Sequence, residues 1–144
     1  MTKTPRVLLI DDNPADVSLI GEASAGGKYQ TKFQNFTDGE KAISHLRTIG
    51  QNAEAAKPDL VILDLNLPRM NGKNVLAFLK TDRELRGIPV VVFSSSQSHW
   101  EISHCYELGA NCYVRKTGDL DGFVSAIRSI EEFWFGTASL PEEG

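Results

Sequence analysis

Four short apolar runs of this sequence are each followed closely by a side chain that could take part in phosphoryl or metal chemistry. In chain order these side chains are Asp11 with Asp12, Asp64, Ser94 and Lys116. Three carboxylates held close together repel one another, and a hard cation among them would relieve that repulsion. Magnesium fits this role best, because it prefers oxygen ligands, keeps several of its waters and is commonly shared with phosphate.

Each of the other groups has a use in phosphoryl transfer, where positioning and charge neutralisation supply most of the catalysis. Asp64 could act as a nucleophile and form an aspartyl phosphate. Lys116 could pair with one phosphoryl oxygen, and the Ser94 hydroxyl could donate to another. Taken singly, such residues are more often a helix cap, a solvated charge and a loop residue. Their shared position after apolar runs favours the chemical interpretation.

The apolar runs predict strands. Leu60–Leu63 is too short for a helix and lacks the alternation of a half-exposed strand, so it predicts a strand buried on both faces. Val7–Ile10 and Val90–Phe93 have the same character, whereas residues 29–36 are more polar and residues 111–114 form a short run. We therefore expect three central strands and two edge strands.

Helices are expected after each strand. The first begins with Asn13 as N-cap, Pro14 at the first helical position and Asp16 in the first turn. The expected bounds of the others are near Gly39 for the start of the second, Asn74 to Leu79 for the third, Leu108 for the end of the fourth and Asp119 to Trp134 for the fifth. The fifth carries an apolar stripe predicted to face the core, made of Leu120, Phe123, Val124, Ile127, Ile130 and Trp134.

The alternation of five strands with five helices predicts an α/β fold, with a doubly wound parallel sheet in the flavodoxin-like strand order 2-1-3-4-5. In that order the carboxyl ends of strands one, three, four and five meet at one rim, which would bring the candidate chemical residues together. We expect one domain over residues 1–144, with a short C-terminal extension from about residue 135.

Composition excludes several classes of function. A net charge of −4 and a pI near 5.3 argue against a nucleic-acid surface, which requires clustered Lys and Arg. No apolar run approaches 18 residues and no signal-peptide pattern is present, so we expect a cytoplasmic protein without a membrane span. Cys105 and Cys112 do not form a disulfide framework or a zinc-binding pattern.

Over about residues 5–134 the sequence resembles the receiver domain of two-component response regulators. The resemblance rests on four motifs in the family's order. They are Val7-Leu-Leu-Ile-Asp-Asp-Asn13, Asp59-Leu-Val-Ile-Leu-Asp-Leu-Asn-Leu-Pro-Arg-Met-Asn-Gly72, Ile88-Pro-Val-Val-Val-Phe-Ser94 and the lysine after the fifth strand, Lys116. The family implies a signalling switch that accepts a phosphoryl group from a histidine kinase and catalyses only its own phosphorylation and dephosphorylation.

The resemblance also implies roles for individual residues. Asp64 matches the phospho-acceptor, Asp12 a direct Mg²⁺ ligand and Asp11 a ligand through water, and the Asn66 main-chain carbonyl matches a further ligand. This set predicts that Asp64 is phosphorylated in the presence of Mg²⁺.

Three further residues match the family's switch and its lysine. Ser94 matches the switch hydroxyl, Tyr113 the aromatic side chain that moves inward, and Lys116 the invariant lysine. One position departs from the pattern. Family members usually have a proline in a cis peptide bond after the lysine, and Thr117 stands there in this chain.

The expected partners are a histidine kinase and a second copy of the chain. The chain length, the Asn13-Pro-Ala-Asp16 segment and the aromatic C-terminal extension resemble the small regulators paired with bacterial phytochrome-type histidine kinases. Phe133 and Phe135 flank the core-facing stripe, and exposed aromatic residues commonly anchor protein contacts. They predict a homodimer through the last helix and the extension, or else a tail that folds back on its own domain.

Two other functions remain as alternatives. A phosphatase of the haloacid dehalogenase type also uses an aspartate nucleophile and magnesium, but it needs an acid two residues after the nucleophile, where this chain has Asn66. A scaffold that is never phosphorylated would lack one of the site's acids or its lysine, and none is missing.

Overall fold

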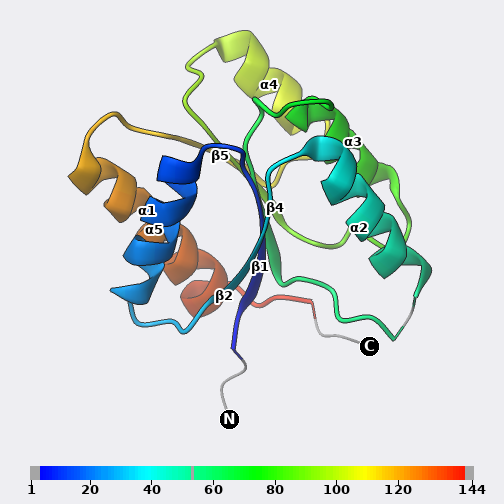
Figure 1. Cartoon of the computed structure of the whole chain (residues 1–144), viewed down its shortest axis with the longest axis horizontal. Coiled ribbons are helices and arrows are strands. Elements are labelled where there is room, and N and C mark those ends of the chain that lie inside the picture. The colour runs from blue at the N-terminus through cyan, green and yellow to red at the C-terminus, as the bar shows by residue number, and fades with distance from the viewer. Residues whose placement is uncertain (1–3, 53, 142–144) are drawn as a thin grey trace.

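The computed structural model describes residues 4–52 and 54–141 (Figure 1). In these ranges a single parallel sheet has the order β2-β1-β3-β4-β5, which confirms the predicted topology. The strands are β1 (Arg6–Ile10), β2 (Lys32–Phe36), β3 (Leu60–Leu63), β4 (Val90–Ser94) and β5 (Cys112–Arg115). The helices are α1 (Pro14–Ala25), α2 (Gly39–Gln51), α3 (Gly72–Thr81), α4 (His99–Glu107), α5 (Leu120–Glu131) and the π-helix η1 (Glu132–Thr137). The last three residues of the predicted extension, 142–144, lie outside the described residues.

Helices cover both faces of the sheet (Figure 1). Successive side chains of a strand point to opposite faces, so β1 contributes to two cores. Val7 and Leu9 pack against α1 and α5, whereas Leu8 and Ile10 pack on the side of α2, α3 and α4. Because both faces are covered, β1, β3 and β4 are almost continuously apolar, and the edge strands β2 and β5 are only partly buried.

The helix starts are fixed by side-chain caps. The Asn13 side chain accepts hydrogen bonds from the N–H groups of Ala15 and Asp16, as the sequence predicts. Helix α3 begins at Gly72, two residues before the predicted Asn74, because the Asn71 side chain caps it. Strand β2 likewise begins at Lys32 rather than residue 29.

The end of the chain differs most from the sequence-based expectation. Helix α5 ends at Glu131 and continues as a π-helix, so the regular helix predicted as far as Trp134 is three residues too long. The predicted core-facing position of Leu120 is wrong, because Leu120 is the first residue of α5 and its side chain is 61% exposed. The other stripe residues, from Phe123 to Trp134, do pack in the core shared with α1.

The aromatic residues of η1 have two different environments. Phe135 is half-buried, and its ring lies edge-on to Tyr29 with the ring centroids 5.8 Å apart. Phe133 remains 52% exposed. The tail therefore covers part of its own domain and leaves one phenylalanine available for contact. Within the described residues, no helix is long and apolar enough to cross a membrane.

The backbone after β3 is packed so closely that Gly72 has no room for a side chain. A Cβ there would lie 2.6 Å from the Leu65 Cα atom, next to the Asp64 main chain. We expect Gly72→Ala to lower the free energy of unfolding by about 1–3 kcal/mol in urea denaturation. Gly21→Ala is the control, since nothing lies within 4 Å of its Cβ, and it should stabilise α1 by about 0.5–1 kcal/mol. Equal effects of the two changes would contradict the close packing.

Candidate functional site

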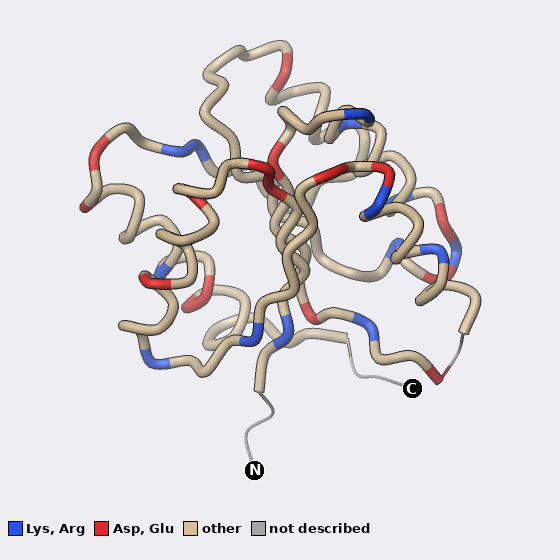
Figure 2. Tube along the Cα trace, in the orientation of Figure 1, with Lys and Arg blue, Asp and Glu red and all other residues tan. Residues whose placement is uncertain are grey.

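The candidate chemical residues lie at the carboxyl ends of the strands, where the ladder hydrogen bonds place them. The Asp64 N–H donates to the Ile10 carbonyl (2.8 Å), and the Lys116 N–H donates to the Ser94 carbonyl (2.8 Å). These bonds extend the sheet by one residue beyond β3 and β5 and hold the attached side chains at one rim. Acidic segments lie at this end of the central strands in Figure 2.

Three carboxylates form the centre of the site. Asp11, Asp12 and Asp64 each offer a carboxylate oxygen, and these oxygens lie within 4.8 Å of one another. Asp11 and Asp64 are buried, whereas Asp12 is exposed. An all-oxygen cluster open on one side matches the needs of a hexacoordinate divalent cation that retains water ligands. The residues present therefore fit the predicted metal site.

Lys116 is the cation that holds this cluster together. Its Nζ atom donates to Asp16 (2.8 Å), Asp11 (2.9 Å) and Asp64 (3.1 Å), and its side chain is only 8% exposed. Burial alone would lower the pKa of Lys116, but the hydrogen bonds to Asp16 and Asp11 and the nearby negative charges raise it well above the usual value. The ammonium group therefore stays charged.

Asp16 is a member of the site that sequence reasoning missed. Its position in the sequence indicates only a favourable acid in the first turn of α1. The available signal was its place in the first turn of the helix that directly follows Asp11 and Asp12, which keeps its carboxylate close to that acidic pair. Its contact with Lys116 ties α1 to the end of β5.

The two buried carboxylates are each held by main-chain donors as well. Asp11 accepts from the Asn13 N–H (2.9 Å), and Asp64 accepts from the Leu65 N–H (2.7 Å). Burial raises the pKa of Asp11, the contacts with Lys116 and Asn13 lower it, and the Asp64 charge raises it again, with a net upward shift. The raised pKa reflects the unfavourable burial and crowding of carboxylates that the sequence predicts, and Lys116 reduces this effect.

A solvent-open pocket of about 380 Å³ gives access to part of this cluster. Its walls include Asp12, Asp64, Asn66, Ser95 and Lys116. Asp11 and Ser94 are not among the lining residues and are almost fully buried. Asp64 is therefore reachable from solvent, and Ser94 lies below the pocket surface.

Ser94 is connected to Tyr113 through the start of the β4–α4 loop. The Tyr113 hydroxyl donates to the Ser96 carbonyl (2.9 Å), and the Ser96 N–H donates to the Ser94 hydroxyl (3.4 Å). Burial raises the pKa of Tyr113, and hydrogen bonding to Ser94 and Ser96 offsets part of the rise. Tyr106, which sequence reasoning did not single out, accepts from the Tyr113 N–H through its hydroxyl (3.0 Å).

The position that departs from the family pattern keeps an ordinary backbone. No peptide bond among residues 4–52 and 54–141 is cis, so the Lys116–Thr117 bond is trans. The Thr117 hydroxyl donates to the Asp119 carbonyl (3.3 Å), next to the start of α5.

Comparison with known proteins gives consistent matches over most of the chain. The sequence model of the response regulator receiver domain matches residues 7–128. Response regulator Rcp1 of Synechocystis sp. is 35% identical over 135 residues, which cover 94% of this chain and 92% of that protein.

Solved structures agree with the sequence comparison. The phosphorylated cyanobacterial phytochrome response regulator RcpA is 42% identical with a TM-score of 0.90, covering 97% of this chain and 100% of that one. The Mn²⁺-bound form of Rcp1 has a TM-score of 0.87 at 34% identity, covering 96% of this chain and 99% of that one.

The contacts of Lys116 predict a large effect of its removal. Lys116→Met would leave two buried carboxylates without their cation, so we expect the free energy of unfolding to fall by about 3 kcal/mol. The measurement is urea denaturation in EDTA, which prevents a divalent ion from replacing the lysine. The exposed Lys41→Met is the control and should change stability by less than about 0.5 kcal/mol. A Lys116→Met protein as stable as the control would contradict the proposed charge balance.

Proposed function

Since the chain belongs to the response regulator receiver family, we propose that Asp64 accepts a phosphoryl group from the phosphohistidine of its kinase. The protein functions in two-component signalling as a switch rather than as a classical enzyme, and its partner is a histidine kinase. The two alternatives have less support. The side-chain amide of Asn66 cannot serve as the general acid of a phosphatase, and all the acids and the lysine expected for phosphorylation are present.

One observation supports Asp64 over the neighbouring acids. Among the described acidic residues of the cluster, only Asp64 is both buried and part of the solvent-open pocket wall. Asp11 is buried without lining the pocket, and Asp12 is exposed. Asp64 is also oriented on two sides, by the Leu65 N–H and by Lys116. A nucleophile held in this way loses little orientational freedom on reaction.

The transfer exchanges one bond for another. A carboxylate oxygen of Asp64 attacks the phosphorus atom, the bond from phosphorus to the kinase imidazole breaks, and the imidazole nitrogen leaves with the bonding electrons. Lys116, which contacts Asp64 at 3.1 Å, then pairs with an oxygen of the new phosphoryl group.

Asp12, Asp64, the Asn66 main-chain carbonyl and, through water, Asp11 would hold Mg²⁺. The bound ion would neutralise the carboxylates and the phosphoryl oxygens. The support is the spacing of the three carboxylates in this chain and the Mn²⁺ bound by the similar protein Rcp1.

The signal is proposed to pass from Ser94 to Tyr113. The Ser94 hydroxyl turns toward the phosphoryl group, which weakens its contact with the Ser96 N–H at the start of the β4–α4 loop. Tyr113 is bonded to the Ser96 carbonyl, so it moves with the loop and changes the surface formed by α4, β5 and α5.

We propose the class of the kinase from similarity to known regulators, and a homodimer from the exposure of Phe133. Similarity to the phytochrome response regulator RcpA supports a phytochrome-type histidine kinase as the partner. Membership of the receiver family supports a cytoplasmic location. The 52% exposure of Phe133 supports a homodimer through α5 and η1. A dimer would present two receivers to a dimeric kinase.

Phosphorylation should depend on both Asp64 and Mg²⁺. Incubation with acetyl phosphate and Mg²⁺ should add one phosphoryl group to the wild-type protein, detected by intact-mass spectrometry, and EDTA should prevent it. Asp64→Asn should abolish the addition, because an amide is not a nucleophile here. The control is Asp121→Asn, an exposed acid of α5 that should be labelled like wild type. Labelling of Asp64→Asn at the wild-type rate would show that another residue is the acceptor.

Dimerisation should depend on Phe133. Phe133→Ser should give a folded monomer that still accepts phosphate, whereas wild type should sediment as a dimer at micromolar concentration. Trp100→Ser is the matched control, because Trp100 is a 67% exposed aromatic residue on α4 and away from η1. A wild-type protein that is monomeric at high micromolar concentration, with or without the phosphoryl group, would exclude the dimer.

A further inference from the structure

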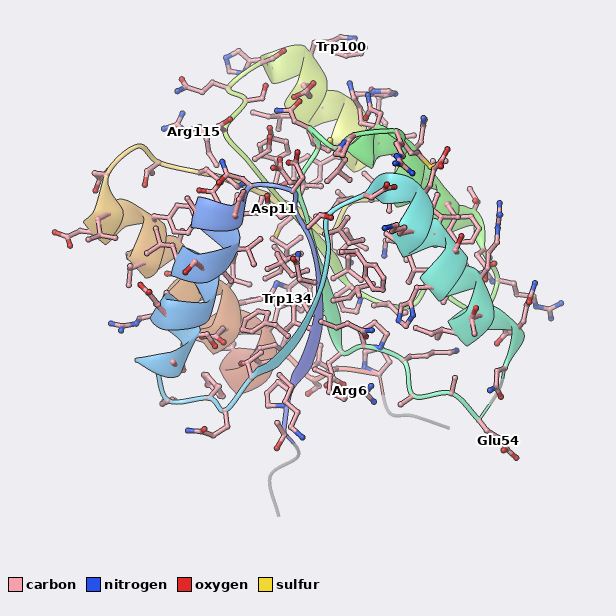
Figure 3. The ribbon with its side chains drawn as sticks, viewed as in Figure 1. Arg6, Asp11, Glu54, Trp100, Arg115 and Trp134 are labelled. Atoms are coloured by element: carbon pink, nitrogen blue, oxygen red, sulfur yellow. The ribbon has the colours of Figure 1, made fainter. Side chains whose placement is uncertain are left out.

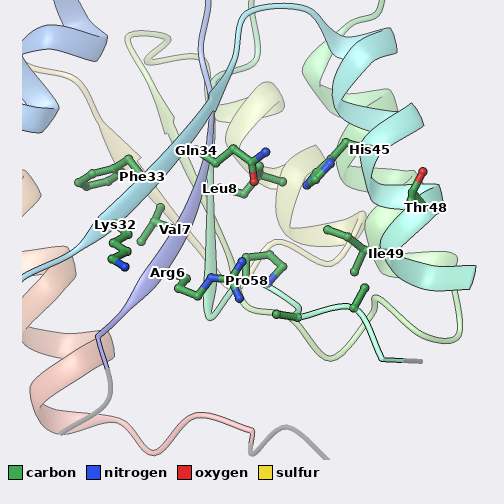
Figure 4. Close-up of a pocket in the computed structure, with 12 residues that line it drawn as sticks. Arg6, Val7, Leu8, Lys32, Phe33, Gln34, His45, Thr48, Ile49 and Pro58 are labelled. Carbon is green, nitrogen blue, oxygen red and sulfur yellow. The ribbon is translucent and has the colours of Figure 1, made fainter. Parts of the chain in front are cut away.

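A second cavity lies at the end of the sheet opposite to the acidic site. Arg6 and Asp11 mark the two ends of β1 in Figure 3, and the cavity is at the Arg6 end. Its volume is about 360 Å³, within the size range of small-molecule sites. The lining residues come from β1, β2, α2 and the α2–β3 loop (Figure 4). They are Arg6, Val7, Leu8, Lys32, Phe33, Gln34, His45, Thr48, Ile49, Ala55, Ala56 and Pro58.

One part of the cavity wall is apolar. Leu8 from β1 and Ile49 from α2 are both buried, and Ala55, Ala56 and Pro58 add further apolar surface from the loop. This part offers a surface for a hydrocarbon or aromatic group of a ligand.

Two polar side chains lie on the cavity wall near its apolar part. Gln34 from β2 and His45 from α2 point toward one another over Leu8 in Figure 4. Within the described part of the chain, neither side chain makes a hydrogen bond, although the His45 ring lies 4.9 Å from that of Phe36. Burial lowers the pKa of His45 and so favours the neutral imidazole, which can still donate one hydrogen bond. Both groups are therefore available to a ligand.

The charge of the wall favours an anion. Arg6 and Lys32 are exposed and contribute two positive charges, and none of the described lining residues is acidic. This differs from the chain as a whole, which has 19 acidic and 15 basic residues. The nearby Asp59 carboxylate is engaged by the Arg6 main-chain N–H (2.9 Å).

We propose that this cavity binds a small organic carboxylate whose apolar body lies against Leu8 and Ile49 and whose carboxylate faces Arg6 and Lys32, with Gln34 and His45 as hydrogen-bond donors. The site is separate from the acidic rim and does not depend on the phosphorylation of Asp64. Helix α2 nevertheless forms part of the cavity wall. The first residue of α2, Gly39, is packed against Met70 in the loop after β3.

The test uses benzoate as the probe and benzamide as its uncharged counterpart. In ¹H–¹⁵N NMR titrations of the full-length protein, benzoate at millimolar concentration should give saturable shifts confined to residues 6–8, 32–34, 45–49 and 55–57. Benzamide should bind at least about tenfold more weakly, because it lacks the charge-assisted contacts. Equal binding of the two, shifts that do not saturate, or shifts centred on the acidic rim would overturn the proposal.

A pair of glutamine variants separates the site from the general charge of the protein. Gln34→Glu places a negative charge in the cavity without removing buried surface, so benzoate affinity should fall at least about fivefold. Gln30→Glu makes the same change at an exposed position outside the cavity and should stay within about twofold of wild type. Equal affinities of the two variants would overturn the assignment, and unchanged amide spectra without benzoate would show that both are folded.

Discussion

The contact of one buried ammonium group with three carboxylates is the interaction on which the site depends. Lys116 reaches Asp11, Asp16 and Asp64 from the end of β5, and thereby links the ends of β1, α1, β3 and β5. Without it, buried acids would favour their neutral forms and a poor nucleophile would result. The same ammonium group is positioned to pair with an oxygen of an incoming phosphoryl group, so the resting contact and the proposed function use one side chain.

The fold keeps these charges together by main-chain geometry rather than by the side chains alone. The parallel ladder places Asp64 beside β1, and the tight passage from β3 to α3 allows only glycine at position 72. An error of one residue in the register would point Asp64 into a core instead of the rim. The apolar strands therefore determine where the acids lie, and the acids in turn determine what the rim can bind.

Much of this arrangement could be predicted from the sequence, because strand periodicity, helix caps and the strand order depend on local patterns. The features that could not be predicted depend on contacts between distant segments. Asp16 meets Lys116 only in the folded chain, and the Tyr106 hydroxyl reaches a backbone group of β5. Leu120 matches the helical stripe, but the stripe does not reveal that its first residue is exposed to solvent. The π-helical end and the cavity beside β2 likewise leave no periodic signal.

We propose that Lys116 exchanges its contact with the Asp64 carboxylate for a contact with the phosphoryl group formed there. A crystal structure with Mg²⁺ and beryllofluoride, which mimics a phosphoryl group on an aspartate, tests this directly. We expect beryllofluoride attached to Asp64, the Lys116 Nζ atom in contact with a fluoride, and the Ser94 hydroxyl turned away from the Ser96 N–H. Beryllofluoride on another residue, or Lys116 still bound to Asp64 as in the resting structure, would contradict it.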